Sequence, residues 1–227
     1  MTMRFAIIAD LTPDPTAGAA GIALALAGTG GHVTLRAVAP EGAATDYLLL
    51  ALASGGVPAN RIDREPDGVI RKGARMDIYD LFGHDVLVLD FADQPLRRFL
   101  TDLPAHTKPD VRMLGTLRHL DTQPPTSDEL EIAMRYDTFT GTPGQFMRLT
   151  GTASPGEALA RIEARMPGTH LRSAVMIGPD AVDIVARDEA IHLALPTTPL
   201  AHAIAIIARG MAERWQWQKT AEFICNR

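Results

Sequence analysis

FAIIAD (residues 5–10) and AGAAGIALALAGTGGHVTLRAV (residues 17–38) decide the fold of this chain. The first stretch is an unbroken apolar run ending in an aspartate, which is typical of a strand buried within a mostly parallel sheet. The second predicts a helix of small and aliphatic residues over 17–27, stopped by glycines and followed by a strand over 32–38. Strand, helix and strand in this order predict a right-handed crossover, in which so smooth a helix can lie very close to the sheet.

The same alternation continues along the chain. Apolar periodicity, caps and turns predict further elements: helices over 45–54, 94–103, 127–134, 154–166, 199–215 and 218–225, strands over 85–91 and 111–114, and a hairpin of strands 173–177 and 181–186. Alternating strands and helices form layered α/β folds. A chain of 227 residues with 46% hydrophobic residues is long enough to bury one core, so we expect a single domain over 1–227.

Composition excludes several function classes. The 22 basic and 27 acidic residues are spread along the chain with a net charge of -5, so we expect no nucleic-acid partner. The one cysteine, Cys225, rules out an intramolecular disulfide. The apolar run over 5–9 is too short for a signal-peptide core or a membrane span. We therefore expect a cytoplasmic protein without a membrane partner.

Common catalytic motifs do not occur in the sequence. The seven histidines are scattered without a His-x-x-x-His pair, and no Gly-x-Ser-x-Gly motif is present. The glycines at 28, 30 and 31 follow a predicted helix and precede a strand, the reverse of the order that points a helix N-terminus at a pyrophosphate. These observations argue against a structural metal, a serine hydrolase and a dinucleotide-binding fold.

Several blocks in a fixed order carry a family resemblance. The segment 17–31, the stretch from Glu41-Gly42 to Leu50, and Gly56-Val57 resemble the N-terminal half of the ribokinase-like (PfkB) carbohydrate kinases. Leu149-Thr150-Gly151 resembles the end of that family's Asn-x-x-Glu block, 175–182 its late strand-turn-strand with Gly178, and Thr197-Thr198 the dipeptide before its Gly-Ala-Gly-Asp helix start. The resemblance implies a three-layer α/β/α fold, ATP and magnesium as cosubstrates, and phosphoryl transfer to a sugar or nucleoside hydroxyl.

The largest departure from the family lies at the start of this late helix. The family's glycine-rich turn offers backbone N–H groups to a phosphate and its aspartate acts as base, whereas this chain has Pro199, Leu200, Ala201 and His202. Proline lacks an N–H, and the next two side chains obstruct close approach of a phosphate. We expect a degenerate anion hole in which Thr198 caps the helix, Pro199 occupies its first turn, and His202 stands at the position of the base.

Further departures concern the metal and the substrate. Gln145 replaces the acid of the Asn-x-x-Glu block, and an amide is a weaker magnesium ligand than a carboxylate. The resemblance places Gly21 at the family's sugar-binding asparagine, where it has no side chain to hydrogen-bond a sugar. Asp10, Asp14 and Gly21 are the candidate substrate-binding residues. Few residues separate the first strand from the helix at Ala17, so we expect no β lid. The sequence also ends where relatives carry another helix beside the nucleotide base.

Three interpretations follow. The first is a ribokinase-like domain that has lost phosphotransfer and acts as a binding, regulatory or accessory subunit, with a protein partner or a second copy of itself. The second is a divergent ATP- and magnesium-dependent sugar or nucleoside kinase, or another small-molecule transferase, in which His202 or an acid such as Asp10, Asp14 or Asp183 serves as the base. The third is an unrelated α/β protein. We also expect Asp10, Gly21 and His202 to line one cleft.

Overall fold

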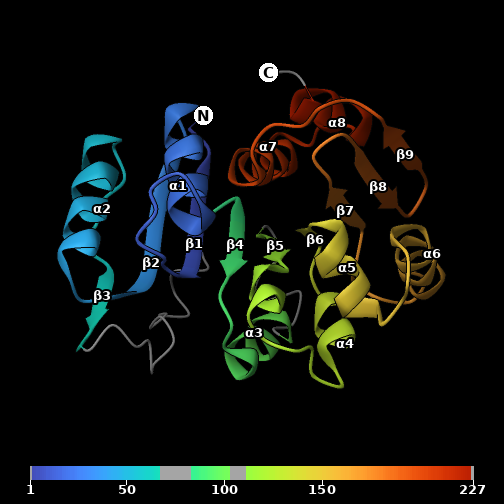
Figure 1. Ribbon diagram of the computed structural model, residues 1–227. Helices are drawn as coiled ribbons and strands as arrows, with labels where there is room; N and C mark the ends of the chain where they lie inside the picture. Colours follow the sequence, from blue (N-terminus) through green and yellow to red (C-terminus); the bar gives the residue numbers. More distant parts are fainter. Residues whose placement is uncertain (1, 67–82, 103–110, 226–227) are drawn as a thin grey trace.

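A nine-stranded sheet forms the centre of the computed structural model over the residues that it describes, 2–66, 83–102 and 111–225 (Figure 1). The strand order is β3-β2-β1-β4-β5-β6-β7-β8-β9. Strands β1 to β7 pair in parallel, and β8 and β9 continue the sheet in antiparallel pairs. The strands are β1 (Arg4–Asp10), β2 (His32–Pro40), β3 (Ile62–Glu65), β4 (Val86–Asp90), β5 (Arg112–Thr116), β6 (Thr138–Gly141), β7 (Ser173–Ile177), β8 (Val182–Ala186) and β9 (Ala190–Leu193).

Helices cover both faces of the sheet. The alternation of side chains along β1 divides the core, because Phe5, Ile7 and Ala9 belong to one buried cluster and Ala6 and Ile8 to the other. The first cluster includes residues of α1 (Gly18–Gly28), α2 (Ala43–Ser54), α7 (Leu200–Glu213) and α8 (Trp217–Cys225). The second includes residues of α3 (Gln94–Thr101), α4 (Glu129–Ala133), α5 (Pro143–Thr150) and α6 (Pro155–Arg165). The predicted three-layer α/β/α architecture is confirmed.

Helix α1 packs tightly against α7 as well as against the sheet. A Cβ atom on Gly21 would lie 2.6 Å from the Thr16 carbonyl oxygen and 2.9 Å from the Ala201 Cβ atom. Real Cβ atoms do not approach backbone this closely, so the glycine is required by packing. The small residues that predict the helix therefore bring the start of α7 next to the start of α1.

Most predicted elements are present, with shifted ends. The segment 11–17 between β1 and α1 contains no strand, as expected for a chain without a lid there. Three short strands, β3, β6 and β9, and the helix α5 were not predicted. The last residue of the predicted helix 94–103 lies outside the described residues. No helix of the described ranges is long and apolar enough to cross a membrane.

The predicted start of α7 is wrong by one residue. The helix begins at Leu200 and Pro199 occupies the N-cap position, with no side-chain hydrogen bond to the helix. Thr198 does not cap it: its backbone N–H donates to the Ile224 carbonyl at 2.9 Å, which ties this segment to α8. Proline tolerates the extended backbone that precedes a helix, and tertiary contact with α8 fixes where the turn begins.

Candidate functional site

The carboxyl ends of β1 and β4 form a crevice at the centre of the sheet. The chain leaves β1 through α1 on one face and leaves β4 through α3 on the other, although the two strands are hydrogen-bonded neighbours. In open α/β sheets, ligands bind where successive crossovers diverge in this way. Asp10 and Asp90, the last residues of the two strands, therefore lie at the position where this topology places a site.

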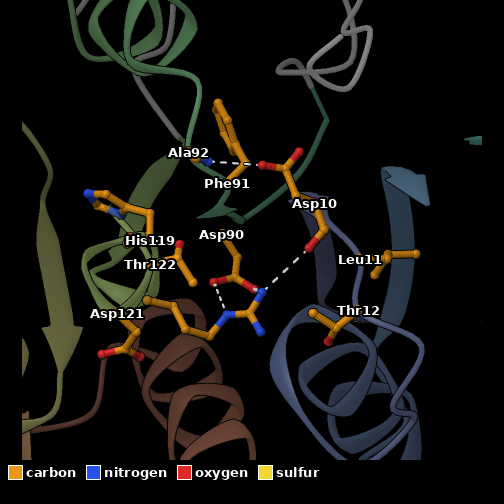
Figure 2. A pocket seen from close by; sticks show the side chains of 10 residues that line it. Asp10, Leu11, Thr12, Asp90, Phe91, Ala92, His119, Asp121 and Thr122 are labelled. Atoms are coloured by element: carbon orange, nitrogen blue, oxygen red, sulfur yellow. Dashed lines mark hydrogen bonds and ion pairs between the residues drawn. The ribbon is translucent and has the colours of Figure 1, made fainter. Parts of the chain in front are cut away.

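A pocket of about 280 Å³, which we call the switch-point pocket or the pocket of Asp10, occupies this crevice (Figure 2). The volume lies just below the range of about 300–1,000 Å³ that suits drug-sized ligands, so a smaller molecule fits. Three segments that each follow a strand supply its lining: Asp10, Leu11 and Thr12 after β1, Asp90, Phe91 and Ala92 after β4, and Arg118, His119, Asp121 and Thr122 after β5.

Arg118 connects these segments. Its Nε donates to Asp90 Oδ1 at 3.0 Å, one terminal nitrogen lies 2.9 Å from Asp90 Oδ2, and the same nitrogen reaches the Asp10 carbonyl at 3.4 Å (Figure 2). The hydroxyl of Thr116 also donates to Asp90 Oδ1 at 2.5 Å. The Asp90 side chain is 1% exposed, so its charge depends on this pairing.

The first residue of α1 makes room for the arginine. Gly18 has a left-handed backbone, with φ at +51°, and a Cβ atom there would lie 2.1 Å from a terminal nitrogen of Arg118. Glycine suits both the conformation and the contact. The guanidinium consequently lies against the first turn of α1, and Arg118 lines the pocket from there.

The carboxyl group of Asp10 is only partly satisfied. Oδ2 accepts a hydrogen bond from the Ala92 N–H at 3.0 Å, whereas Oδ1 is buried and has no hydrogen-bond partner within the described residues. Burial raises the pKa of Asp10, the Ala92 hydrogen bond opposes this rise, and the charges of Asp90 and Asp93 add to it. A ligand with a hydroxyl or amine donor would supply the missing bond.

A buried ionic cluster lies beside the pocket. Arg97 Nη1 donates to Glu129 Oε1 at 2.5 Å, and His119 Nε2 lies 2.9 Å from the same oxygen. Burial alone raises the pKa of Glu129, but the hydrogen bonds from His119 and Arg97 outweigh it and lower the pKa to about 2. The cluster ties the short 3₁₀ helix Arg118–Asp121 to α3 and α4, and so holds Arg118 in place.

Gln145 is fully engaged in structural hydrogen bonds. Its Oε1 accepts a hydrogen bond from the Thr142 N–H at 2.9 Å, and its own backbone N–H donates to Thr142 Oγ1. These two bonds form a capping box at the start of α5. Its Nε2 donates to Asp121 Oδ2 at 2.7 Å. No described group of three His, Cys, Asp or Glu side chains has the arrangement of a metal site. Since both ends of the Gln145 amide are occupied, this residue does not fit a role as magnesium ligand.

The structure separates the other residues singled out from the sequence. Gly178, Pro199 and Leu200 line a second cleft of about 620 Å³ with Thr142 and Thr197. His202 is exposed and lines a third cleft along α7. The prediction that Asp10, Gly21 and His202 line one cleft is wrong. Gly21 is buried between α1 and α7, and His202 lines a different cleft from Asp10.

The remaining two candidates also lie apart from the pocket. Asp14 is exposed and accepts hydrogen bonds from the N–H and hydroxyl of Thr16, both at 2.8 Å, which lower its pKa. Ala201 is buried against Gly21. Asp10 is thus the one residue among the sequence candidates that lines the switch-point pocket. Asp90 and Arg118 were missed, although 86–90 shows the same signal as the first strand, an apolar run ending in an aspartate.

Comparisons with solved structures bear on the fold. The chain superposes on a PfkB protein from Polaromonas sp. JS666 with a TM-score of 0.69 and 14% identity, covering 99% of this chain and 94% of that one. A tetrameric inhibited form of Escherichia coli phosphofructokinase-2 gives a TM-score of 0.65 and 13% identity, with coverage of 98% and 91%. A pyrophosphate-dependent kinase of the ribokinase family, solved with a pyrophosphate analog and myo-inositol, gives a TM-score of 0.69 and 10% identity. The superposition covers 99% of this chain and 92% of that one.

Sequence comparisons find no counterpart. No protein-family profile matches the chain, and no curated protein matches it. Identities of 10–14% establish a shared fold and nothing finer. Together with the sheet order and the two helical layers, the superpositions show that this chain has the ribokinase-like fold.

Proposed function

We propose that this ribokinase-like domain binds a small polar molecule in the switch-point pocket and does not transfer a phosphoryl group to it. The observation that carries the proposal is the separation of this pocket from α7: no residue of α7 lines it among the described residues, and His202 lines a different cleft. Phosphoryl transfer depends almost entirely on positioning and electrostatic stabilisation. Pro199 and His202 line one groove, but an acceptor in the pocket of Asp10 would share no lining residue with it, so neither could be positioned on that acceptor.

The chemistry of the pocket indicates the kind of ligand. Arg118 is paired with Asp90, whereas Asp10 Oδ1 is buried without a hydrogen-bond partner within the described residues. His119, which also lines the pocket, has an unpartnered Nδ1 there as well. A carboxylate accepts hydrogen bonds, so hydroxyl or amine donors suit it, whereas an anionic ligand would be repelled. We therefore expect a small polyol or amine rather than a sugar phosphate.

Phosphorus-31 NMR tests this proposal. The protein is incubated with ATP, magnesium and a panel of polyols and amino sugars, while thermal denaturation of the same mixtures without ATP reports binding. The expected result is a raised Tm with at least one member and no new phosphate ester. An ester whose formation requires Asp10, shown by its absence with Asp10→Asn, would contradict the loss of activity.

The second candidate is a divergent small-molecule kinase with Asp10 as the base. One observation favours it: burial raises the pKa of Asp10, which makes this carboxyl a better proton acceptor. Of the alternative acids, Asp14 is outside the pocket and Asp183 pairs with His192 at 2.6 Å. The NMR experiment separates the two candidates.

The proposal includes assembly with a second copy or another protein. Tyr47 and Leu50, three residues apart on α2, have exposed fractions of 69% and 65%. Large exposed apolar side chains that neighbour each other are typical of contact surfaces. Sedimentation of the unmodified protein should show an assembly, and Leu50→Glu should weaken it. If the unmodified protein and the variant both sediment as monomers, the proposed assembly is contradicted.

A further inference from the structure

A groove runs along the outer surface of α7. Helix α7 lies between α1 and α8 and contacts both (Figure 1). Residues of α1 and α8 line the groove together with those of α7. The groove has a volume of about 440 Å³ and shares no lining residue with the pocket of Asp10. Its lining comes from the start and outer face of α7, from the second half of α1 and from the aromatic residues of the C-terminal region: Thr198, Pro199, His202, Ala205, Ile206 and Arg209, then Ala25 and Thr29, then Trp215 and Phe223.

The turn that ends α7 places Trp215 against Phe223, and these two aromatic residues line one end of the groove. Arg214 adopts a left-handed conformation, with φ at 57°, and the following Trp215 N–H donates to the Gly210 carbonyl at 2.8 Å. A Cβ atom on Gly210 would lie 3.3 Å from the Trp215 ring and 2.9 Å from the Thr220 hydroxyl, so glycine permits this approach. The Trp215 and Phe223 rings then stack with centroids 4.8 Å apart.

Positive charge gathers at this aromatic end. The ammonium nitrogen of Lys219 lies 4.1 Å from the centroid of the Trp215 ring, and the guanidinium carbon of Arg209 lies 5.5 Å from it. Glu213 accepts from Arg209 Nε and from Trp215 Nε1, both at 2.7 Å. Two cations against one carboxylate leave a net positive charge here, in a chain whose net charge is -5.

The other end of the groove is mostly apolar, and its polar groups are the Thr198 hydroxyl and the exposed His202 imidazole. Pro199, Ala205, Ile206 and Ala25 supply the apolar lining. The Oγ1 atom of Thr198 is buried and has no hydrogen-bond partner within the described residues. From Pro199 to Arg209 the groove follows α7 for about 15 Å, at a rise of ~1.5 Å per residue. Its shape is elongated, and its polarity changes from one end to the other.

We propose that this groove binds an elongated apolar molecule ending in a single anionic group, such as a free medium-chain carboxylate. The anionic group pairs with Arg209, which lines the groove, and Lys219 adds positive charge from its place over the Trp215 ring. The apolar chain lies over Ile206 and Ala205 toward Pro199. Charge complementarity favours this occupant, because the cations lie at one end and the apolar lining occupies the rest. A partner helix or a membrane surface would instead match charges spread along or around the groove.

Competition with the fluorescent anion 8-anilinonaphthalene-1-sulfonate tests the proposal on the full chain. Decanoate should displace the probe at least about tenfold more effectively than decylamine, because a paired charge contributes that much. Arg209→Gln should remove most of this preference and leave decanol unaffected, whereas Arg209→Lys should retain it. Ile206→Glu should abolish displacement by decanoate, and Phe99→Glu, an equivalent change at an exposed position on α3, should not.

Several results would overturn the proposal. Equal displacement by decanoate and decylamine would remove the charge argument, and an Ile206→Glu variant that binds like the unmodified protein would move the site elsewhere. Far-ultraviolet circular dichroism of each variant establishes that it is folded. Dissociation of an assembly by Ile206→Glu, or binding of the chain to anionic vesicles but not to free decanoate, would show that a protein or a membrane occupies the groove. None of these outcomes depends on the pocket of Asp10.

Discussion

Gly18 illustrates how a single residue sets the geometry of the pocket. Its φ of +51° is a conformation that costs other residues about 1–2 kcal/mol. A Cβ atom would also lie 2.1 Å from a terminal nitrogen of Arg118, so the guanidinium that pairs with Asp90 would have to shift. We predict that Gly18→Ala lowers the free energy of unfolding by roughly 2–4 kcal/mol, because Asp90 would lose its partner while buried. Urea denaturation measures this. Gly28→Ala at the other end of α1, where nothing lies within 4 Å, is the control and should cost little; equal losses would refute the role of Arg118.

Gln145 stabilises the fold through hydrogen bonds, although the family resemblance assigns its position to a magnesium ligand. Because its Nε2 donates to Asp121, Gln145→Glu would place two carboxylates in contact. We predict a loss of about 1–3 kcal/mol at pH 7. The repulsion raises the pKa of one carboxyl in the folded state, so the deficit should shrink as the pH falls through that pKa. Unfolding at pH 7 and 5 measures it, with Gln123→Glu as an exposed control. A pH-independent deficit would point to lost packing instead.

Asp10 should make the folded protein less stable at neutral pH. Burial raises its pKa, so the folded state holds the proton more tightly than the unfolded chain, and the contribution of Asp10 to stability grows as the pH falls through the folded pKa. We predict that Asp10→Asn, which keeps the bond from Ala92, raises the Tm at pH 7. The variant should also lack the gain in stability that the natural protein obtains from Asp10 as the pH falls through the raised pKa toward the ordinary value of 3.8. A lower Tm for the variant at pH 7 would mean that the charged carboxylate is stabilised in the fold.

Among the elements, long apolar runs and capped helices could be predicted from the sequence, and short polar ones could not. Strand β6 is fully buried but reads Thr-Phe-Thr-Gly, and its Thr138 hydroxyl pairs with that of Ser173 on β7, 2.9 Å away. The capping box of Thr142 and Gln145 was a local signal for α5. It was interpreted as a degenerate metal block, because the resemblance assigned that position a ligand.

A fourfold substitution at the start of α7 tests whether this helix start limits nucleotide binding, as the proposed loss of phosphotransfer implies. Changing Pro199, Leu200, Ala201 and His202 to Gly, Ala, Gly and Asp would expose backbone N–H groups to the cleft that Gly178 and Thr197 line. We predict that the fourfold variant binds ATP weakly, with a dissociation constant in the millimolar range. The single substitution Pro199→Ala should give no detectable ATP binding. Calorimetry measures both. If the fourfold variant also fails to bind, the defect lies outside the helix start.

At the scale of the whole molecule, the sheet brings together residues that the sequence keeps far apart. Arg118 reaches the Asp10 carbonyl across 108 positions, and Ala92 reaches the Asp10 carboxyl across 82. The sequence placed Asp10 at the correct edge because apolar strands end there. It could not pair Asp90 with Arg118, since that contact depends on the strand order. For the same reason His202 was expected in the pocket, whereas the packing of α7 turns it toward another cleft.

The proposed loss of phosphotransfer rests on the separation of the switch-point pocket from the start of α7. Calorimetric titration of the unmodified protein with ATP and magnesium tests it most directly, because a kinase of this fold needs a nucleotide beside the acceptor. We predict no heat of binding at micromolar nucleotide. Micromolar affinity for ATP, strengthened by a polyol that occupies the pocket of Asp10, would contradict it.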